Sequence, residues 1–354
     1  MQLYRDTVYM KSNKRIAVTF NDPVALFPFY NGKPGETQFQ DDTSESSFFI
    51  ELDLIVDSLS EYYNEVKSIN ATSDIYKFID DLKEYRPDIV FNLVESVAGI
   101  SSFESYIAGL YELLKFEYTG NNPQTLGNCL NKANTKYFLS YNNLSIPHFK
   151  IIKYKEAVSE NSIKLKFPLI TKLLKEDASI GISENSIITS YNQLQKQLDF
   201  LFSTYNQDVI LEEYIDGREF NIAILGNEAL PASEIVFDTL PEELPKIVTY
   251  EGKWIADSVY YKNTIPQCPA KISTSLSDEL KRISLQAFNA LGCRDYARVD
   301  IRLSQENIPY IIEVNPNPDI STDSGFSRAA KSHGLAHCEL LHTIAEFAIG
   351  RAKR

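Results

Sequence analysis

The sequence contains few cysteines and no long apolar segment. The cysteines are widely separated, which fits neither a disulfide framework nor a close metal-binding pair, and predicts free thiols in a reducing compartment. They are Cys129, Cys268, Cys293 and Cys338. No run approaches the roughly 20 apolar residues that a membrane-spanning helix requires, and residues 1–11 hold no apolar core of signal-peptide length. We therefore expect a cytoplasmic protein.

Basic side chains are also scarce. The chain has 35 lysines and arginines against 48 acidic residues, and its formal net charge is -13. Such a surface repels the phosphate backbone of nucleic acids, and the basic run at residues 351–354 is too short to attract one. The rest of the composition, with 44% apolar and 23% charged residues, is typical of a globular protein. We expect small-molecule partners, and neither nucleic acid nor a membrane.

The first third of the chain alternates strand and helix patterns. Residues 14–19 and 88–94 are short apolar runs typical of buried strands, and the apolar residues of 48–63 recur at helical spacing. The polar stretch 21–47 is predicted to be a long loop. Strand, helix and strand in this order predict an open α/β domain.

The remaining two thirds predict two further units, after a polar boundary at residues 119–123. The first opens with a helix to about residue 141, continues with short strands and a helix, and ends near the turn formed by Asp216 and Gly217. The second contains strands, a long helix, a hairpin and two closing helices. We therefore expect an α/β (α+β) fold divided at residues 1–123, 124–216 and 217–354.

The predicted hairpin carries the sharpest chemical signal. Its two arms alternate polar and apolar residues, so Asp300 on the first arm and Glu313 and Asn315 on the second project from polar faces. Two carboxylates and an amide oxygen are the ligands that magnesium prefers when it also binds nucleotide phosphates. Ile311, two residues before Glu313, is expected on the same face and would partly cover it. A solvent-exposed hairpin would show the same alternation, so these residues alone leave both interpretations open.

Several motifs resemble those of D-alanine–D-alanine ligases and their ATP-grasp relatives. The segment ARVDIRL at residues 297–303, followed by IIEVNPNPDIS at 311–321, resembles the metal-binding hairpin of this family. The other matching segments are FPLITKLLKEDASIGIS (167–183), LEEYIDGREF (211–220), NKANTK (131–136) and YEGK (250–253). They follow the family's order, which makes the resemblance specific. It implies an ATP-grasp fold that uses ATP with magnesium, or with manganese in its place.

The resemblance also implies roles for individual residues. Lysines would bind the nucleotide phosphates, a serine would lie in the phosphate loop, Glu212 and the backbone of 213–215 would read the adenine, and Glu219 would bind the ribose. The implied nucleotide-binding set is Lys132, Lys172, Ser179, Glu212, Glu213, Tyr214, Ile215 and Glu219. The implied metal ligands are Asp300, Glu313 and Asn315.

Three residues would act on the substrates. Lys253 would close over the transferred phosphate, Arg298 would stabilise the negative oxygen of a tetrahedral intermediate, and Ser324 would hold the carboxylate of the second substrate. Lys136, one helical turn from Lys132, is predicted to be a solvated neighbour.

The sequence departs from the family pattern near the substrates and the phosphates. Asp177 brings a side chain and a negative charge to the phosphate loop, Glu95 stands where the ligases carry a histidine, and residues 21–47 have no clear counterpart. His333 and His337 have the spacing of a helical zinc pair, but Gly334 predicts a helix end between them. The first substrate is therefore not indicated by the motifs.

The favoured hypothesis is an ATP-dependent carboxylate–amine ligase that forms an amide through an acyl phosphate. Its substrates would be amino acids or short peptides, D-alanine being one candidate, and a homodimer is the family expectation. Two alternatives remain open at this stage. One is a nucleotide-binding protein without ligase turnover, motivated by Asp177, and the other is an ATP-grasp phosphotransferase.

Overall fold

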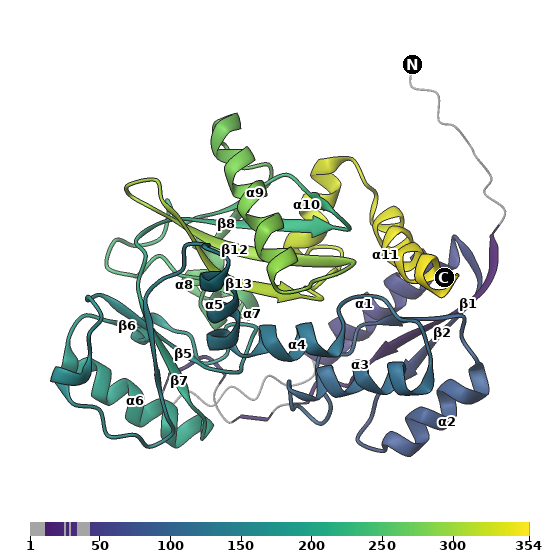
Figure 1. The fold of residues 1–354 in the computed structure, drawn as a ribbon, viewed down its shortest axis with the longest axis horizontal. Helices are drawn as coiled ribbons and strands as arrows, with labels where there is room; N and C mark the ends of the chain where they lie inside the picture. Colours follow the sequence, from purple (N-terminus) through teal and green to yellow (C-terminus); the bar gives the residue numbers. More distant parts are fainter. Residues whose placement is uncertain (1–10, 25, 28–29, 34–42, 354) are drawn as a thin grey trace.

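A computed structural model describes residues 11–24, 26–27, 30–33 and 43–353. Three β-sheets with flanking helices give the expected mixed α/β class (Figure 1). Residues 25, 28–29 and 34–42 of the loop predicted over 21–47 lie outside the described residues. The last part of that prediction is wrong, because helix α1 already begins at Thr43. All four cysteines are free thiols. Within the described residues, no helix is both long enough and apolar enough to cross a bilayer.

The first sheet is parallel, with strand order β2-β1-β3. Its strands are β1 (Ser12–Phe20), β2 (Tyr63–Asn70) and β3 (Ile89–Asn92), and its helices are α1 (Thr43–Ser60), α2 (Ile75–Tyr85) and α3 (Phe103–Leu114). Strand β2 and helix α2 were not predicted from the sequence. In β2 only Tyr63 and Ile69 are buried, so this edge strand lacks the apolar run that revealed β1 and β3.

The second sheet is antiparallel, with order β4-β7-β5-β6. Its elements are β4 (Phe149–Ile152), η1 (Glu160–Ser162), β5 (Leu169–Leu173), η2 (Glu184–Ser186), β6 (Ile187–Ile188), α6 (Tyr191–Tyr205) and β7 (Val209–Glu213). Helix α6 buries Leu194, Leu198 and Leu201 at helical spacing against the sheet. Strand β7 ends at Glu213, so the chain passes from this sheet directly into the residues predicted to bind the nucleoside.

The third sheet has the order β11-β10-β8-β12-β13, and β9 pairs with β8. Its strands are β8 (Gly217–Leu225), β9 (Glu228–Ala229), β10 (Ser233–Val236), β11 (Ile265–Gln267), β12 (Tyr296–Ser304) and β13 (Pro309–Pro316). The helices of this part are α7 (Tyr250–Trp254), α8 (Val259–Asn263), α9 (Thr274–Ala290), α10 (Gly325–His333) and α11 (His337–Ala352). Helix α9 covers one face of the sheet, and Ile222 and Ile224 of β8 pack into that core.

The helix expected up to residue 141 is two helices, α4 (Pro123–Leu130) and α5 (Lys132–Tyr141). The break falls at Asn131, whose backbone is extended and whose Oδ1 accepts hydrogen bonds from the amides of Ala133 (3.1 Å) and Asn134 (3.4 Å). An asparagine that satisfies these amides is a favourable helix N-cap. The break places Lys132 at the start of α5.

The last helix, α11, packs against α1 and the first sheet (Figure 1). Leu341 and Ile344 of α11 share one buried core with Leu52 of α1 and Ile16 of β1. The division at residues 1–123, 124–216 and 217–354 stays a prediction. Helix α11 is one of the elements whose contacts cross it, and α4, which contacts both α3 and β13, is another.

We predict that Gly217→Ala destabilises the fold by about 3 kcal/mol. Gly217 has φ +149°, and an added Cβ would lie 1.9 Å from the carbonyl oxygen of Leu303. Relief requires the β8 and β12 backbones to separate. Chemical denaturation measures the loss. Gly350→Ala in α11 is the control, because nothing lies within 4 Å of its Cβ position. Equal stability of the two variants would contradict the prediction.

Candidate active site

The predicted hairpin exists, and its register aligns the proposed metal ligands. Asp300 of β12 lies opposite Glu313 of β13, and Arg298 lies opposite Asn315. Val299 and Ile301 point into the core under α9, so the alternating residues Arg298 and Asp300 project from the other face. Directly opposed side chains of antiparallel strands lie on the same face. The hairpin therefore gathers these four polar side chains.

Ile311 does not cover the polar face, so that prediction is wrong. The register shifts between Asp300 and Ile301: Asp300 pairs with Glu313, whereas Ile301 pairs with Ile311. Such a β-bulge moves one side chain to the opposite face of the sheet. Ile311 consequently lies 1% exposed in the core under α9, and the face with Glu313 stays free of it.

Asp300 is held by three side chains. Its carboxylate accepts hydrogen bonds from Nε and Nη2 of Arg298, at 2.8 and 2.9 Å. The side-chain amide of Asn221 on the adjacent strand β8 donates to Oδ1 at 2.7 Å, and that of Asn315 donates to Oδ2 at 3.0 Å. Asn221 was not predicted, although a polar residue in the apolar strand β8 was a usable signal. The contacts fix the orientation of the Asp300 carboxylate.

Lys132 connects the hairpin to the predicted phosphate loop. Its Nζ lies 2.8 Å from Oε1 of Glu313 and 3.1 Å from Oδ1 of Asp177. Burial alone would lower the pKa of Lys132, but the two carboxylates raise it. Burial alone would raise the pKa of Glu313, but Lys132 and Lys172 lower it to about 2. Both groups are therefore charged near neutral pH.

A second buried network surrounds Glu212. Its carboxylate lies 3.1 Å from Nζ of Lys136 and 3.2 Å from Nζ of Lys172. Lys136 is 0% exposed, so the prediction that it is solvated is wrong. Residues four apart share a helix face, and the face of α5 that buries Lys132 buries Lys136 as well. Burial lowers the pKa of Lys136, and Glu212 opposes that shift.

The nucleoside segment runs from Glu213 to Glu219. The amide of Tyr214 donates to the carbonyl of Pro168 at 3.0 Å, and the Glu213 carboxylate accepts the amide of Lys166 at 2.9 Å. Burial raises the pKa of Glu219. The guanidinium of Arg302, whose Nη1 lies 3.0 Å from Oε2 of Glu219, partly opposes that rise. The contacts of Arg302 with this segment were not predicted.

The predicted phosphate loop has unusual backbone conformations. Ala178 and Ser179 have positive φ (55° and 61°), and the hydroxyl of Ser179 donates to the carbonyl of Val248 at 3.1 Å. The amide of Gly181 donates to the carbonyl of Tyr30 at 2.8 Å. The side chain of Asp177, predicted to alter this loop, is turned onto Lys132.

Helix α7 carries Lys253 and lies against the phosphate loop. Nε1 of Trp254 donates to the carbonyl of Ala178 at 3.1 Å, and the amide of Tyr250 donates to that of Ile182 at 3.0 Å. The surrounding protein and the Arg298 guanidinium lower the pKa of Lys253. Its ammonium is therefore within electrostatic range of the hairpin.

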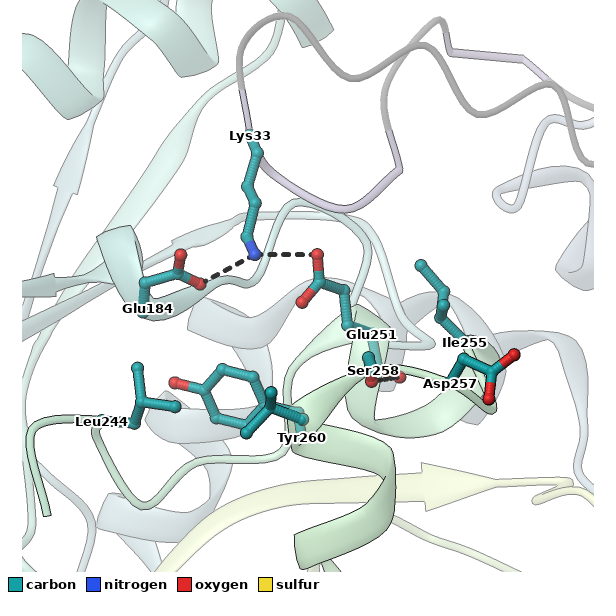
Figure 2. Close-up of a pocket in the computed structure, with 9 residues that line it drawn as sticks. Lys33, Glu184, Leu244, Glu251, Ile255, Asp257, Ser258 and Tyr260 are labelled. Atoms are coloured by element: carbon teal, nitrogen blue, oxygen red, sulfur yellow. Dashed lines mark hydrogen bonds and ion pairs between the residues drawn. The ribbon is translucent and has the colours of Figure 1, made fainter. Parts of the chain in front are cut away.

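Lys33, from the N-terminal part, bridges η2, which follows the phosphate loop, and helix α7 (Figure 2). Nζ of Lys33 lies 3.2 Å from Oε2 of Glu184 and 2.8 Å from Oε1 of Glu251, on the wall of a cavity of about 420 Å³. Burial opposes the charged form of Lys33, but the two carboxylates raise its pKa. Nothing in the polar pattern of 21–47 indicated this bridge.

We predict that Lys33→Met speeds proteolytic cleavage of residues 248–263 about fivefold. Two partly buried ion pairs that contribute together about 1 kcal/mol would keep this segment closed. Limited proteolysis followed by mass spectrometry measures the cleavage rate. High salt screens the ion pairs, so it should reduce the difference in cleavage rate between Lys33→Met and the native chain. Lys77→Met on α2, at an exposed position, is the control. Unchanged cleavage in Lys33→Met would count against the bridge.

The remaining predicted residues lie around α10. Ser324 is its buried N-cap and accepts the amide of Ser327 at 3.1 Å. Helix α10 ends before Gly334, which has φ +101°, so His333 and His337 lie on different helices. In the described ranges, no group of three or more His, Cys, Asp or Glu residues could hold a metal. The hairpin set differs in its third member, the amide of Asn315.

Comparison with known proteins identifies the family and relatives of this chain. Residues 139–346 match the family model described as D-ala D-ala ligase C-terminus. An uncharacterized protein, y4sG of Sinorhizobium fredii, is 34% identical and the match covers 73% of this chain and 74% of that protein. The D-alanine–D-alanine ligase of Ruthia magnifica is 31% identical over 70% and 78%. That of Actinobacillus succinogenes is 29% identical over 77% and 84%.

Solved structures show the same fold. The D-alanine–D-alanine ligase from Bacillus anthracis complexed with ATP aligns with a TM-score of 0.72 at 22% identity, over 96% of this chain and 99% of that chain. The enzyme from Coxiella burnetii aligns with a TM-score of 0.69 at 19% identity, over 97% and 96%.

The fold and these relatives define an ATP-grasp protein of the ATP-dependent carbon–nitrogen ligase class. Within that class, the chain belongs to the D-alanine–D-alanine ligase C-terminal family. This assignment favours the ligase over the nucleotide-binding protein without turnover and over the phosphotransferase.

Proposed function

We propose that this protein joins the carboxylate of one amino acid or short peptide to the amine of another, with ATP converted to ADP and phosphate. The observation that carries the proposal is the gathering of Arg298, Asp300 and Glu313 next to Lys132. A permanently charged guanidinium, two carboxylates and a buried ammonium suit a reaction in which negative charge develops on phosphate and acyl oxygens.

Magnesium is part of this proposal, with manganese as a substitute. Asp300, Glu313 and Asn315 supply only hard oxygen donors, which suits either ion. Asn315 donates its Nδ2 hydrogen to Asp300, so its Oδ1 is the atom left for a cation. The Asp300 carboxylate accepts hydrogen bonds from Arg298, Asn221 and Asn315, and Glu313 pairs with Lys132, so a bound cation would displace some of these donors. When bound, the ion would screen phosphate charge.

The chain's own residues have the following proposed roles. Lys132, Lys172 and the loop at Ser179 bind phosphates, and Lys253 approaches them from α7. The nucleoside is bound by the remaining predicted set, Glu212, Glu213, Tyr214, Ile215 and Glu219.

In the reaction, a carboxylate oxygen attacks the terminal phosphorus and ADP leaves. The amine then attacks the acyl carbon, Arg298 stabilises the negative oxygen, phosphate leaves and the nitrogen loses a proton. Ser324 is proposed to hold the carboxylate of the second substrate.

D-Alanine is one substrate candidate, because several relatives are named D-alanine–D-alanine ligase. The test is purified protein with ATP, magnesium and a panel of L- and D-amino acids and dipeptides. Phosphate release and product masses are followed together. A product mass equal to both substrates minus water is expected. ATP binding without product from any pair would contradict the proposed function.

The proposal includes a cytoplasmic location and a homodimer. Sedimentation equilibrium of the purified chain tests the dimer, and fractionation of the source cells tests the location. A monomer across the concentration range would remove the dimer from the proposal without affecting the chemistry.

A further inference from the structure

Arg302 is a buried arginine beside the proposed nucleoside segment. Its side chain projects from β12 two residues after Asp300 and is 5% exposed. Residue 302 pairs in register with Glu219 of β8, just as Asp300 pairs with Asn221. The paired strands β8 and β12 thus carry the proposed metal ligand Asp300 and, two residues further along the same face, the proposed nucleoside contact at Arg302 and Glu219.

The guanidinium of Arg302 contacts three residues of the nucleoside segment, Tyr214, Ile215 and Glu219. Nη1 donates to Oε2 of Glu219 at 3.0 Å, and Nε donates to the carbonyl of Ile215 at 3.1 Å. Nη2 donates to the hydroxyl of Tyr214 at 2.7 Å and to the carbonyl of Lys246 at 2.9 Å. The guanidinium carbon also lies 5.1 Å from the centre of the Tyr214 ring.

These contacts use the fixed geometry of an arginine. Its donors form a planar fork, so bonds to several acceptors fix their relative positions. A lysine offers one rotatable ammonium and could not reach all of them. The fork therefore sets the backbone at Ile215 and the carboxylate of Glu219 as one unit relative to β12.

We propose that Arg302 is a positioning residue for the nucleoside, which orients Glu219 toward the ribose hydroxyls and the backbone of Tyr214 and Ile215 toward the adenine. The inference rests on the proposed function, because it takes from there the nucleoside roles of these residues. It adds a division of labour: Arg302 determines nucleoside affinity and selectivity, whereas Arg298, on the same face of the strand, acts on the reacting groups.

The test compares Arg302→Met with the native chain. The expected result is a KM for ATP raised about 10- to 100-fold, the equivalent of lost hydrogen bonds to a charged group, with kcat changed less than about threefold. The native chain should prefer ATP over 2′-deoxy-ATP, and the variant should lose most of that preference because Glu219 is no longer oriented. Arg302→Lys should fall between the two.

The matched control is Arg282→Met. Arg282 lies on α9 and forms a two-nitrogen contact with the carboxylate of Glu279 at 2.8 and 2.7 Å. It thus loses an ion pair of the same kind outside the nucleoside segment. Its KM for ATP should stay native.

Calorimetric titration with ATP and 2′-deoxy-ATP separates this inference from the proposed function. Native affinity and native selectivity in Arg302→Met, or a loss confined to kcat, would overturn the inference even if the enzyme is active. The inference can be supported even if no substrate pair gives product. In that case the native chain should still bind ATP more tightly than 2′-deoxy-ATP, and Arg302→Met should lose this preference. If Arg302→Met does not fold, a weaker preference in Arg302→Lys serves as the same evidence.

Discussion

Turnover by Glu313→Gln is expected to fall about a thousandfold, because a bound divalent ion supplies several kcal/mol of charge stabilisation in phosphoryl transfer. Glutamine keeps the size of the side chain but removes the charge that would hold the ion. It also removes one of the two carboxylates paired with Lys132, the one at 2.8 Å, while Asp177 remains. Phosphate release with the productive substrate pair measures the effect, and higher magnesium should recover only part of it.

The control for this variant lies on the same hairpin. Glu306 is exposed in the turn between β12 and β13, so Glu306→Gln makes the same chemical change outside the gathered side chains. It should retain native turnover. If Glu313→Gln stayed within a few-fold of the native chain while folding normally, the hairpin would not be the metal site.

Arg298→Lys should lower turnover by about 10²- to 10³-fold, the size of effect found when an oxyanion-stabilising donor is removed. Lysine keeps the charge but cannot reproduce the bidentate contact with Asp300, at 2.8 and 2.9 Å. ATP affinity should change much less, because the nucleoside contacts are made elsewhere. Single-turnover product formation and ATP titration together measure this difference.

Arg282→Lys on α9 is the matched control for that variant. Arg282 also forms a two-nitrogen contact with a carboxylate, that of Glu279, but on the exposed surface. Arg282→Lys should leave both the rate of product formation and the affinity for ATP unchanged. If Arg298→Lys weakened ATP binding as strongly as turnover, Arg298 would serve nucleotide binding rather than the acyl step.

Local sequence patterns predicted the elements that bury a regular apolar face. The period-two alternation of β12 and β13 was visible because both strands cover the core under α9. The break at Asn131 and the bulge after Asp300 were not predicted, since each depends on one residue's backbone and leaves the surrounding pattern intact. That bulge is why Ile311 was placed on the wrong face.

Contacts between distant strands explain what the sequence could not indicate at the site. Strands β8 and β12 lie side by side although about eighty residues separate them in the sequence. This pairing brings Asn221 to Asp300 and Arg302 to Glu219. The partner strand cannot be identified from the neighbouring sequence, although Asn221 itself stands out as a polar residue in an apolar strand. The burial of Lys136 has the same origin, because it depends on which face of α5 meets β13 and Glu212.

The packing of α11 on α1 has a consequence for biosynthesis. The first sheet is translated early, but its apolar face is completed by Leu341 and Ile344. Until α11 has emerged from the ribosome, that face is covered only in part, by α1, and exposed apolar surface on a nascent chain promotes aggregation. The N-terminal unit therefore reaches its full stability only after α11 has been synthesised and has packed against it.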